Sequence, residues 1–326
     1  MFDLISVGDC MIDHFFKIHD AHVALSVDKT KKELCINYGD KIGVDQYDQL
    51  VAGNAANNAV GSSRLGLKTA FYTNVGSDPM GQKVIHKMKE EKVESKYVTV
   101  NQGLDSNVSA VINFKGERTI LVYHQPWKYD LPDLDRTKWV YFTSMSPTFA
   151  DSKIVDQLIN YLERTGARLG FNPGTHQLKH GVKKFPRLLS LMTVLFVNVQ
   201  EAMLILGLEE KVNIKKLLKG LSDLGPKMVV ITDGGEGSYG FDGESYYKLG
   251  VFKAKLLEMT GAGDAFATGT VAGLFHGQIL SEAMRWGAAN SASVVEQVGP
   301  QAGLLTLEAI QSRLKENSNL MAREIS

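Results

Sequence analysis

The chain has 326 residues, and its 36 basic and 36 acidic side chains give a formal net charge of zero at pH 7. This balance argues against a nucleic-acid-binding protein, which needs a basic surplus to displace counterions from phosphates. Hydrophobic residues make up 44% of the chain and charged residues 22%. That composition excludes a disordered or fibrous protein, and the length is ample for a sizeable core.

The chain contains two cysteines, Cys10 and Cys35. Two are too few for a disulfide framework and favour a reducing compartment. The N-terminal segment has no basic stretch, and its short apolar run predicts a buried strand and not a signal peptide. The longest apolar stretch, residues 188–199, is interrupted by polar residues and is shorter than the ~20 residues that cross a bilayer. We therefore expect a cytoplasmic protein with no membrane or nucleic-acid partner.

Short β-branched runs alternate with helical patterns along most of the chain. In one helical pattern Met80, Val84 and Met88 recur every four residues and mark an apolar face. This alternation predicts right-handed crossovers and a mostly parallel sheet with helices on both faces, an α/β/α sandwich of three layers. We expect strands at 4–7, 69–75, 139–143, 167–172, 194–198, 228–232 and 252–257, and helices at 55–65, 79–93, 152–164, 200–206, 214–224 and 265–275.

Two regions, 14–50 and 96–124, show strand-like alternation without helices. Within the second, residues 108–114 and 118–123 predict a β-hairpin with Gly116 in its turn. These regions could form an antiparallel edge of the main sheet or a small β-sheet lid over a ligand site. We favour the lid, because both insertions flank the same early part of the sheet. The core would then comprise residues 1–13, 51–95 and 125–326.

The segment Thr260-Gly261-Ala262-Gly263-Asp264 stands at the predicted start of a helix. Small residues there leave backbone N–H groups accessible, and these donors with the helix dipole form an anion site. A carboxylate at Asp264 would be a poor phosphate ligand, but it is well placed to take a proton from a hydroxyl that attacks phosphorus. Alternatively, Asp264 could simply stabilise the first helical turn and the glycines could form a tight turn.

Two better-known phosphate motifs are excluded by the same sequence. A dinucleotide fingerprint needs a third glycine where Phe266 stands. The spacing from Gly220 to Gly225 fits a P-loop, but Pro226 and Lys227 follow where Lys and Ser or Thr are required.

Three further segments place small or polar residues at predicted strand or helix ends. The first, 51–59, is rich in small residues and amides, which suits ligands with many hydroxyls. The second includes Asn198 and Glu201 after a buried strand, where a carboxylate can organise Mg²⁺ through water. The third, 232–237, ends another strand in a glycine-rich turn.

Taken together, these features resemble the ribokinase-like (PfkB) carbohydrate kinases along nearly the whole chain, and they occur in that family's order. The matching positions are Gly8 and Asp13 after the first strand; Gly53, Asn57, Leu65 and Gly66 of the N-terminal signature; Asn198 and Glu201 of the N-x-x-E motif; Thr232, Gly234 and Gly237 of the T-x-G-x-x-G turn; and Thr260 to Asp264 with Phe266 of the C-terminal signature.

The resemblance implies transfer of the γ-phosphoryl group of ATP, with Mg²⁺, to a primary hydroxyl of a small carbohydrate. It implies that Asp264 is the catalytic base and that the N–H groups of Gly261, Ala262 and Gly263 form the anion hole. It further assigns Asp13, Gly53 and Asn57 to the acceptor, and Asn198, Glu201, Thr232, Gly234, Gly237 and Asn290 to the nucleotide, with Glu201 helping to position Mg²⁺.

The chain departs from the family pattern at several positions. Glu258 and Met259 replace the Asp-Thr pair of members that bind a monovalent cation, so dependence on potassium is an open question. Asn54 replaces a substrate-side lysine, and Met11 and Met145 replace polar residues of ribose-specific members. A sugar acceptor is preferred, a nucleoside is the alternative, and a catalytically silent sensor is disfavoured by the intact Gly261–Asp264 segment. Through its lid the chain could also form a homodimer.

Overall fold

A computed structural model describes residues 1–25, 32–115, 117–210 and 212–325. Its largest element is a ten-stranded sheet in the order β16-β15-β14-β13-β12-β11-β10-β1-β6-β7. Neighbouring strands are parallel from β7 to β13 and antiparallel from β13 to β16. The strands are β1 (Phe2–Val7), β6 (Thr69–Gly76), β7 (Glu94–Asn101), β10 (Thr137–Phe142), β11 (Arg168–Phe171), β12 (Met192–Asn198), β13 (Met228–Thr232), β14 (Ser238–Phe241), β15 (Tyr246–Leu249) and β16 (Arg323–Glu324).

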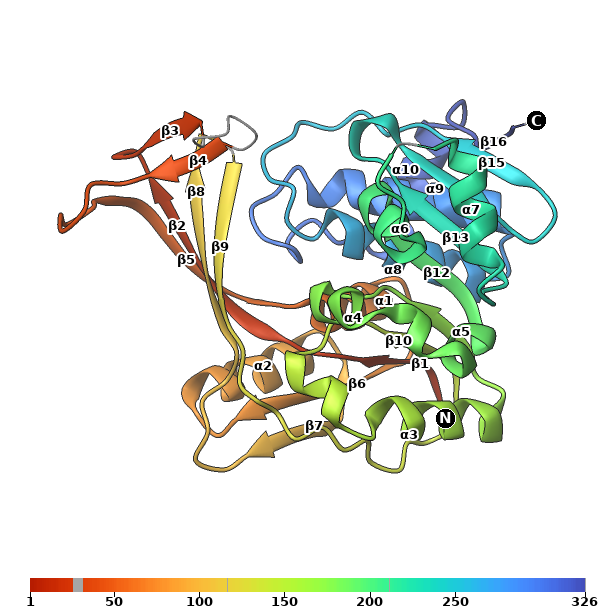
Figure 1. Ribbon diagram of the computed structural model, residues 1–326, viewed down its shortest axis with the longest axis horizontal. Helices are drawn as coiled ribbons and strands as arrows, with labels where there is room; N and C mark the ends of the chain where they lie inside the picture. The colour runs from red at the N-terminus through yellow and green to blue at the C-terminus, as the bar shows by residue number, and fades with distance from the viewer. Residues whose placement is uncertain (26–31, 116, 211, 326) are drawn as a thin grey trace.

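Helices cover both faces of this sheet (Figure 1). The predicted three-layer α/β/α architecture is confirmed, because apolar strands buried on both sides need a helical layer on each face. The helices are α1 (Asn54–Arg64), α2 (Pro79–Glu90), α3 (Ile154–Thr165), α4 (Thr175–His180), α5 (Pro186–Leu191), α6 (Val199–Leu206), α7 (Ile214–Ser222), α8 (Ala262–Phe275), α9 (Leu280–Val294) and α10 (Leu307–Glu316). Among the described residues, none of these helices combines the length and apolarity that a bilayer crossing requires.

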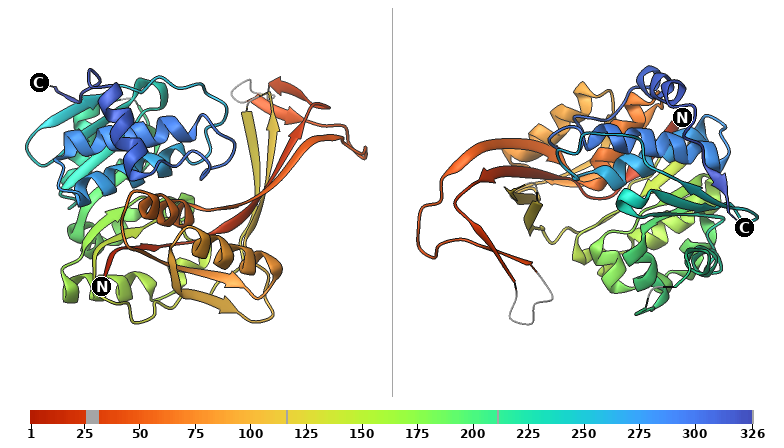
Figure 2. Two further views of the ribbon diagram at one scale, coloured as in Figure 1. Left: turned by 180° about the vertical axis from the view of Figure 1, so that it is seen from behind. Right: turned by 90° about the horizontal axis from the view of Figure 1, so that it is seen from above.

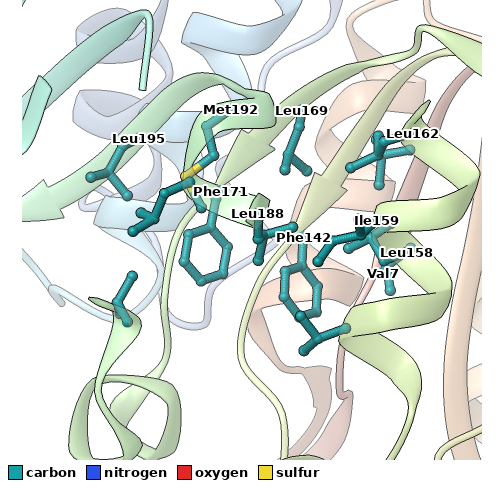
Figure 3. Packing of buried hydrophobic residues seen from close by; sticks show 14 of the residues in the cluster. Val7, Phe142, Leu158, Ile159, Leu162, Leu169, Phe171, Leu188, Met192 and Leu195 are labelled. Atoms are coloured by element: carbon teal, nitrogen blue, oxygen red, sulfur yellow. The ribbon is translucent and has the colours of Figure 1, made fainter. Parts of the chain in front are cut away.

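The core lies between the sheet and its two helical layers. On one face, strand residues pack on α3 and α5, and Phe142 stacks on Phe171 with ring centroids 5.2 Å apart (Figure 3). On the other face, α8, α9 and α10 form a second apolar cluster. Each large side chain buried in this way contributes roughly 1.5–3 kcal/mol. These two layers hold the strand ends that carry the polar segments in fixed positions.

A separate four-stranded sheet, which we call the lid, projects from the core beside the C-terminal half (Figures 1 and 2). Its order is β5-β2-β8-β9, and the predicted hairpin of β8 and β9 is confirmed. Gly116, expected in that turn, lies outside the described residues. The lid strands are β2 (Met11–Ile18), β5 (Val44–Ala52), β8 (Val108–Phe114) and β9 (Glu117–Tyr123), and a two-stranded sheet of β3 (His22–Leu25) and β4 (Lys32–Cys35) lies at its far end.

The structure differs from the sequence-based expectation in two elements. Strand β7 pairs with β6 in the central sheet, so the second lid segment begins after β7 and not at residue 96. The strand expected at 252–257 is absent, since these described residues form an irregular and mostly exposed connection. Instead of joining a ladder, the end of this segment bonds the end of α9, where the N–H groups of Leu257 and Glu258 donate to the Val295 carbonyl at 2.8 and 3.2 Å.

Candidate active site

The carboxyl ends of the parallel strands meet at one edge of the central sheet, as the topology requires. Asn198 and Thr232, which end β12 and β13, are direct register partners there. Asp9 and Asp13 follow β1, whose last residue Val7 pairs with Phe142 at the end of β10. Segments that are far apart in the sequence therefore lie along the same edge, where open α/β sheets place their ligands.

Asp264 lies in the first turn of α8 and is almost completely buried. The Asn57 side chain on α1 donates from Nδ2 to Asp264 Oδ2 at 2.8 Å. Gln301 in turn donates from Nε2 to Asn57 Oδ1 at 3.1 Å. Asn57 was expected on the acceptor, and its place in the structure is directly beside Asp264. The arrangement fixes one carboxylate oxygen and leaves Oδ1 without a hydrogen-bond partner among the described residues.

Burial raises the pKa of Asp264 to about 6, against the lowering effect of the Asn57 hydrogen bond and with a further raising effect from the Glu201 charge. A carboxyl group with this pKa is ionised at neutral pH and still accepts a proton more readily than an exposed aspartate. Because the two charges influence each other, Glu201 and Asp264 share one electrostatic environment.

The backbone before Asp264 forms an open helix start. Gly261 has a φ of 80°, and a Cβ there would lie 2.5 Å from Pro300 Cβ. The Ala262 N–H donates to the Met259 carbonyl at 3.3 Å, so this amide is already engaged. In the described part of the chain, no such backbone bond engages the N–H groups of Gly261 or Gly263. A Cβ at Gly263 would meet nothing within 4 Å. The helix start therefore faces free space with donors available to an anion.

Asn198 and Glu201 form a reciprocal cap at the start of α6. Glu201 N donates to Asn198 Oδ1 at 2.8 Å, and Asn198 N donates to Glu201 Oε2 at 2.9 Å. Burial raises the pKa of Glu201. The cap uses one Glu201 oxygen, and Oε1 has no hydrogen-bond partner in the part of the chain that the structure describes.

The turn after β13 carries the other residues expected at the nucleotide. Thr232 ends the strand and Gly234 begins a short 3₁₀ turn. Gly237 has a φ of 95°, and a Cβ there would lie 2.1 Å from the Leu249 carbonyl oxygen, so only glycine fits.

Asn290 has a structural position on α9. Its side chain is fully buried, donates to the Ala265 carbonyl at 2.8 Å and accepts from the Leu305 N–H at 2.9 Å. These bonds tie α8 to α9 and to the loop that follows. The structure therefore gives this side chain a role in holding the fold together, and its expected place at the nucleotide stays a prediction. Its spacing in the sequence could not reveal that both polar atoms are bound by backbone groups.

Asp13 on the lid strand β2 is buried, and Ser109 on β8 donates to its Oδ1 at 2.5 Å. Burial raises the pKa of Asp13 to about 6, with a further raising effect of Glu258 and an opposing effect of Ser109 and Arg118. Gly53 precedes α1 with a φ of 98°, and a Cβ there would lie 2.7 Å from Cys10 Cα. The start of α1 therefore lies against the connection that carries Asp13.

Asp9 is a buried residue that was not among those expected at the site. Its buried carboxylate accepts hydrogen bonds from Tyr129 Oη at 2.8 Å and from the Ser146 N–H at 2.7 Å. Burial raises the pKa of Asp9 to about 6. Its position after β1 was a usable signal, since polar residues after the other parallel strands were noticed. Gln301 gave no such signal, because its partner Asn57 is 244 positions away in the chain.

The side chains at this edge of the sheet suit a cation whose ligands are mainly waters and substrate phosphates. In the described ranges no group of three or more His, Cys, Asp or Glu side chains could enclose a metal ion. Within residues 1–25, 32–115, 117–210 and 212–325, no hydrogen bond engages Glu201 Oε1, and the Glu201 charge acts on Asp264. Mg²⁺ in phosphoryl-transfer sites is held by one or two carboxylates together with waters and substrate phosphates. These residues therefore fit Mg²⁺ in that mode.

Comparison with known proteins decides the family. A protein-family model described as "pfkB family carbohydrate kinase" matches residues 1–307 of the chain. The chain belongs to the PfkB family of carbohydrate kinases. It is 27% identical over 325 residues to an ATP-dependent 6-phosphofructokinase of Thermoanaerobacterium thermosaccharolyticum, covering 95% of this chain and 93% of the relative. It is 22% identical to a 5-dehydro-2-deoxygluconokinase of Shouchella clausii, covering 97% and 96%.

Solved structures of PfkB relatives share the fold. A ribokinase of Arabidopsis thaliana complexed with ribose and ATP superposes with a TM-score of 0.79 at 20% identity, covering 96% of this chain and 99% of that one. A nucleoside kinase of Methanocaldococcus jannaschii gives a TM-score of 0.76 at 20% identity, covering 97% and 99%. The PfkB chain described here is thus a phosphotransferase with an alcohol group as acceptor, and the family supports ATP as its donor.

Proposed function

We propose that this PfkB kinase transfers the γ-phosphoryl group of ATP to a primary hydroxyl of a small carbohydrate, with Asp264 as general base. The observation that supports this most directly is the buried Asp264 carboxylate, which Asn57 holds beside the unengaged amides at the start of α8. Asp264 Oδ1 would accept the proton of the acceptor hydroxyl as its oxygen attacks the γ-phosphorus. The hydroxyl then becomes the bridging oxygen of the phosphate ester, and ADP leaves.

The charge that develops on the transferred group would be met by the N–H groups of the Gly261–Ala262–Gly263 turn. Gly261 and Gly263 are the first candidates, since the Ala262 N–H must leave the Met259 carbonyl to contribute. Mg²⁺, when bound, would neutralise phosphate charge, and Glu201 Oε1 would hold it directly or through water. Asn198, Thr232, Gly234 and Gly237 would border the nucleotide along the same sheet edge.

On the acceptor side, Asp13 offers an oxygen beside Ser109, and Gly53 allows α1 to approach closely. The lid would exclude water, which otherwise competes with the hydroxyl for the phosphoryl group. The names of the two curated relatives contain a sugar phosphate and a sugar acid derivative, which supports a sugar over a nucleoside. Met145 is buried in the core cluster and adds no apolar flank for a nucleobase.

A panel assay tests the proposal. Purified protein is given ATP and Mg²⁺ with ribose, fructose, fructose 6-phosphate, a keto-deoxy sugar acid or adenosine, and ADP formation and the phosphorylated product are measured. Turnover of at least one sugar well above the rate without acceptor supports the proposal. Turnover of adenosine alone would replace the sugar with a nucleoside, and release of ADP without any phosphorylated acceptor would remove the kinase assignment.

The pH dependence of the reaction follows from the raised pKa of Asp264. Because the base must be ionised, kcat/KM is expected to rise about tenfold per pH unit below pH 6 and to level off above pH 7. The rate is measured from pH 4.5 to 8.5 with the best acceptor, and each sample is returned to pH 7.5 to verify that no unfolding occurred. A flat profile across pH 5–7 would contradict an Asp264 base with this pKa.

We propose in addition that two copies associate through the outer face of the lid. Sheet register places Asp13 and Ser109 on the inner face, so Leu121 and Tyr123 of β9 point outward. Both are more than half exposed and line an apolar depression together with His14 and Phe16 of β2. Exposed apolar patches of this kind on a sheet are typical of protein interfaces.

Light scattering coupled to gel filtration tests this association. The parent chain is expected to elute with twice its 35.8 kDa mass, and Leu121→Lys to shift it to the monomer, because a buried unpaired charge at an interface is costly. Met321→Lys places the same charge on another apolar residue that is at least half exposed, outside the lid, and should change nothing. A parent chain that is monomeric at tens of micromolar would refute the proposed dimer.

A further inference from the structure

Two strands of the lid contact the loops that surround Asp264. From β9, Arg118 donates from Nη1 to Thr260 Oγ1 at 2.8 Å. From β5, Leu50 packs on Gly299 so closely that a Cβ there would lie 2.4 Å from Leu50 Cδ1. Thr260 directly precedes the glycine turn of α8, and Gly299 begins the loop behind it. The lid is therefore attached to the catalytic end of α8 by one polar and one apolar contact.

The two contact points are joined to each other. Thr260 Oγ1 donates to Glu258 Oε1, and the Gly299 N–H donates to Glu258 Oε2 at 2.8 Å. Glu258 is buried, so its carboxylate depends on these donors for compensation of its lost hydration. It holds the loop before the glycine turn and the loop that starts at Gly299 at a constant separation.

From Gly299 the network continues to the catalytic group. Pro300 lies against Gly261. The next residue, Gln301, donates to Asn57, which donates to Asp264 at 2.8 Å. Contacts therefore run without interruption from the lid guanidinium to the backbone of the anion-binding turn and to the carboxylate beside it.

We propose that Arg118 is a positioning residue, which acts through Thr260 to align the amides of the Gly261 turn and the Asp264 carboxylate when the lid lies over the acceptor. The proposal rests on the proposed kinase reaction and adds to it a lid residue that controls the rate of the chemical step. A displacement of about 1 Å in catalytic groups can cost about 100-fold in rate. A single hydrogen bond at this point can therefore influence turnover more than stability.

An alternative use of Arg118 would be to bind an anionic group of the acceptor directly. The lid also contains a second cation that can be compared with Arg118. In the strand register, Arg118 of β9 lies opposite Asn113 of β8, and Asn113 lies opposite Lys17 of β2. Lys17 is therefore an exposed cation in the same row of the sheet and on the same face. If lid cations bound the acceptor by charge, both residues would matter. A role through Thr260 predicts an effect of Arg118 alone.

The test compares kcat and acceptor KM of the parent with Arg118→Ala, Thr260→Val, the double variant and Lys17→Ala. We expect Arg118→Ala and Thr260→Val each to lower kcat about 10-fold or more with acceptor KM within about threefold. The double variant should lose no more than Thr260→Val alone, because both remove the same connection. Arg118→Lys, which keeps one donor, should recover part of the loss, and Lys17→Ala should match the parent. An unchanged kcat in Arg118→Ala would overturn the proposal. So would a double variant whose loss of kcat equals the product of the two single losses. A raised acceptor KM in both Arg118→Ala and Lys17→Ala would also overturn it.

Amide hydrogen exchange separates this proposal from the kinase assignment. The peptide covering residues 258–264 should exchange faster in Arg118→Ala than in the parent or in Lys17→Ala, whether or not an acceptor has been found. Equal exchange in all three proteins would show that Arg118 does not hold the turn. A parent protein that phosphorylates nothing, with accelerated exchange in Arg118→Ala, would overturn the reaction and leave the structural connection supported.

Discussion

Replacing Asp264 by asparagine is expected to lower kcat by about 10³-fold while the affinity for ATP changes by less than about threefold. The amide has nearly the same shape and its oxygen can still accept the hydrogen bond from Asn57. It cannot take a proton from the acceptor hydroxyl, and general base catalysis contributes a factor of this size. Turnover with the best acceptor and nucleotide binding by calorimetry measure the two quantities separately.

The same variant is expected to be more stable than the parent at pH 8. The folded protein raises the pKa of Asp264 from 3.8 to about 6, so it binds the proton more tightly than the unfolded chain does. The ionised carboxylate therefore costs folding free energy on the order of 1–3 kcal/mol above pH 6, and this cost disappears as pH falls through 6 toward 4. The midpoint of thermal unfolding should favour Asp264→Asn at pH 8, and the difference from the parent should vanish only as pH falls below the unfolded pKa of 3.8.

Asp105→Asn, a change at an exposed aspartate, serves as the control for both measurements. It should match the parent in kcat and in the pH dependence of unfolding. Equal turnover in Asp264→Asn and the parent would remove Asp264 as the base. A variant that is less stable than the parent at pH 8 would show that the carboxylate is compensated in the folded chain.

Replacing either of two glycines in this turn by alanine is expected to lower activity, but for different physical reasons. Gly261→Ala should lower both stability and kcat, because its φ of 80° is unfavourable for alanine and the new Cβ would lie 2.5 Å from Pro300. Strain of this kind costs about 1–3 kcal/mol, and relief of it displaces the anion-binding amides. We expect at least a 100-fold loss of kcat.

Gly263→Ala has no strained φ, and its Cβ would meet nothing within 4 Å. The variant should therefore unfold at the temperature of the parent. If the free space before α8 receives the transferred phosphoryl group, the methyl group obstructs it, and kcat/KM for ATP falls by at least about tenfold. Unfolding curves and ATP titrations of both variants check the pair. Normal activity of Gly263→Ala would place the phosphoryl group elsewhere.

Local patterns in the sequence determined the secondary structure of most of the core and the residues at its strand ends. Buried β-branched runs such as 228–232 form the expected strands, since each burial pattern is a property of the segment itself. The turn before α8 was recognisable because small residues leave the N–H groups of a helix start accessible, and because the other family motifs occur in the same order. The failed strand at 252–257 shows the limit of this reasoning, because a strand needs a partner beside it, and the local sequence does not report where the chain runs relative to other strands.

Tertiary structure alone decided which of those residues are accessible and what they contact. It brought Asn57 and Gln301 to Asp264, buried both polar ends of Asn290, and placed Arg118 of the lid on Thr260. These contacts join positions that are 15 to 244 residues apart. A hydrogen bond across such a separation depends on how sheet and helices pack as a whole, and the pKa of a buried carboxylate depends on every group around it. The local sequence around each residue contains no signal for such a long-range hydrogen bond or for such a pKa shift.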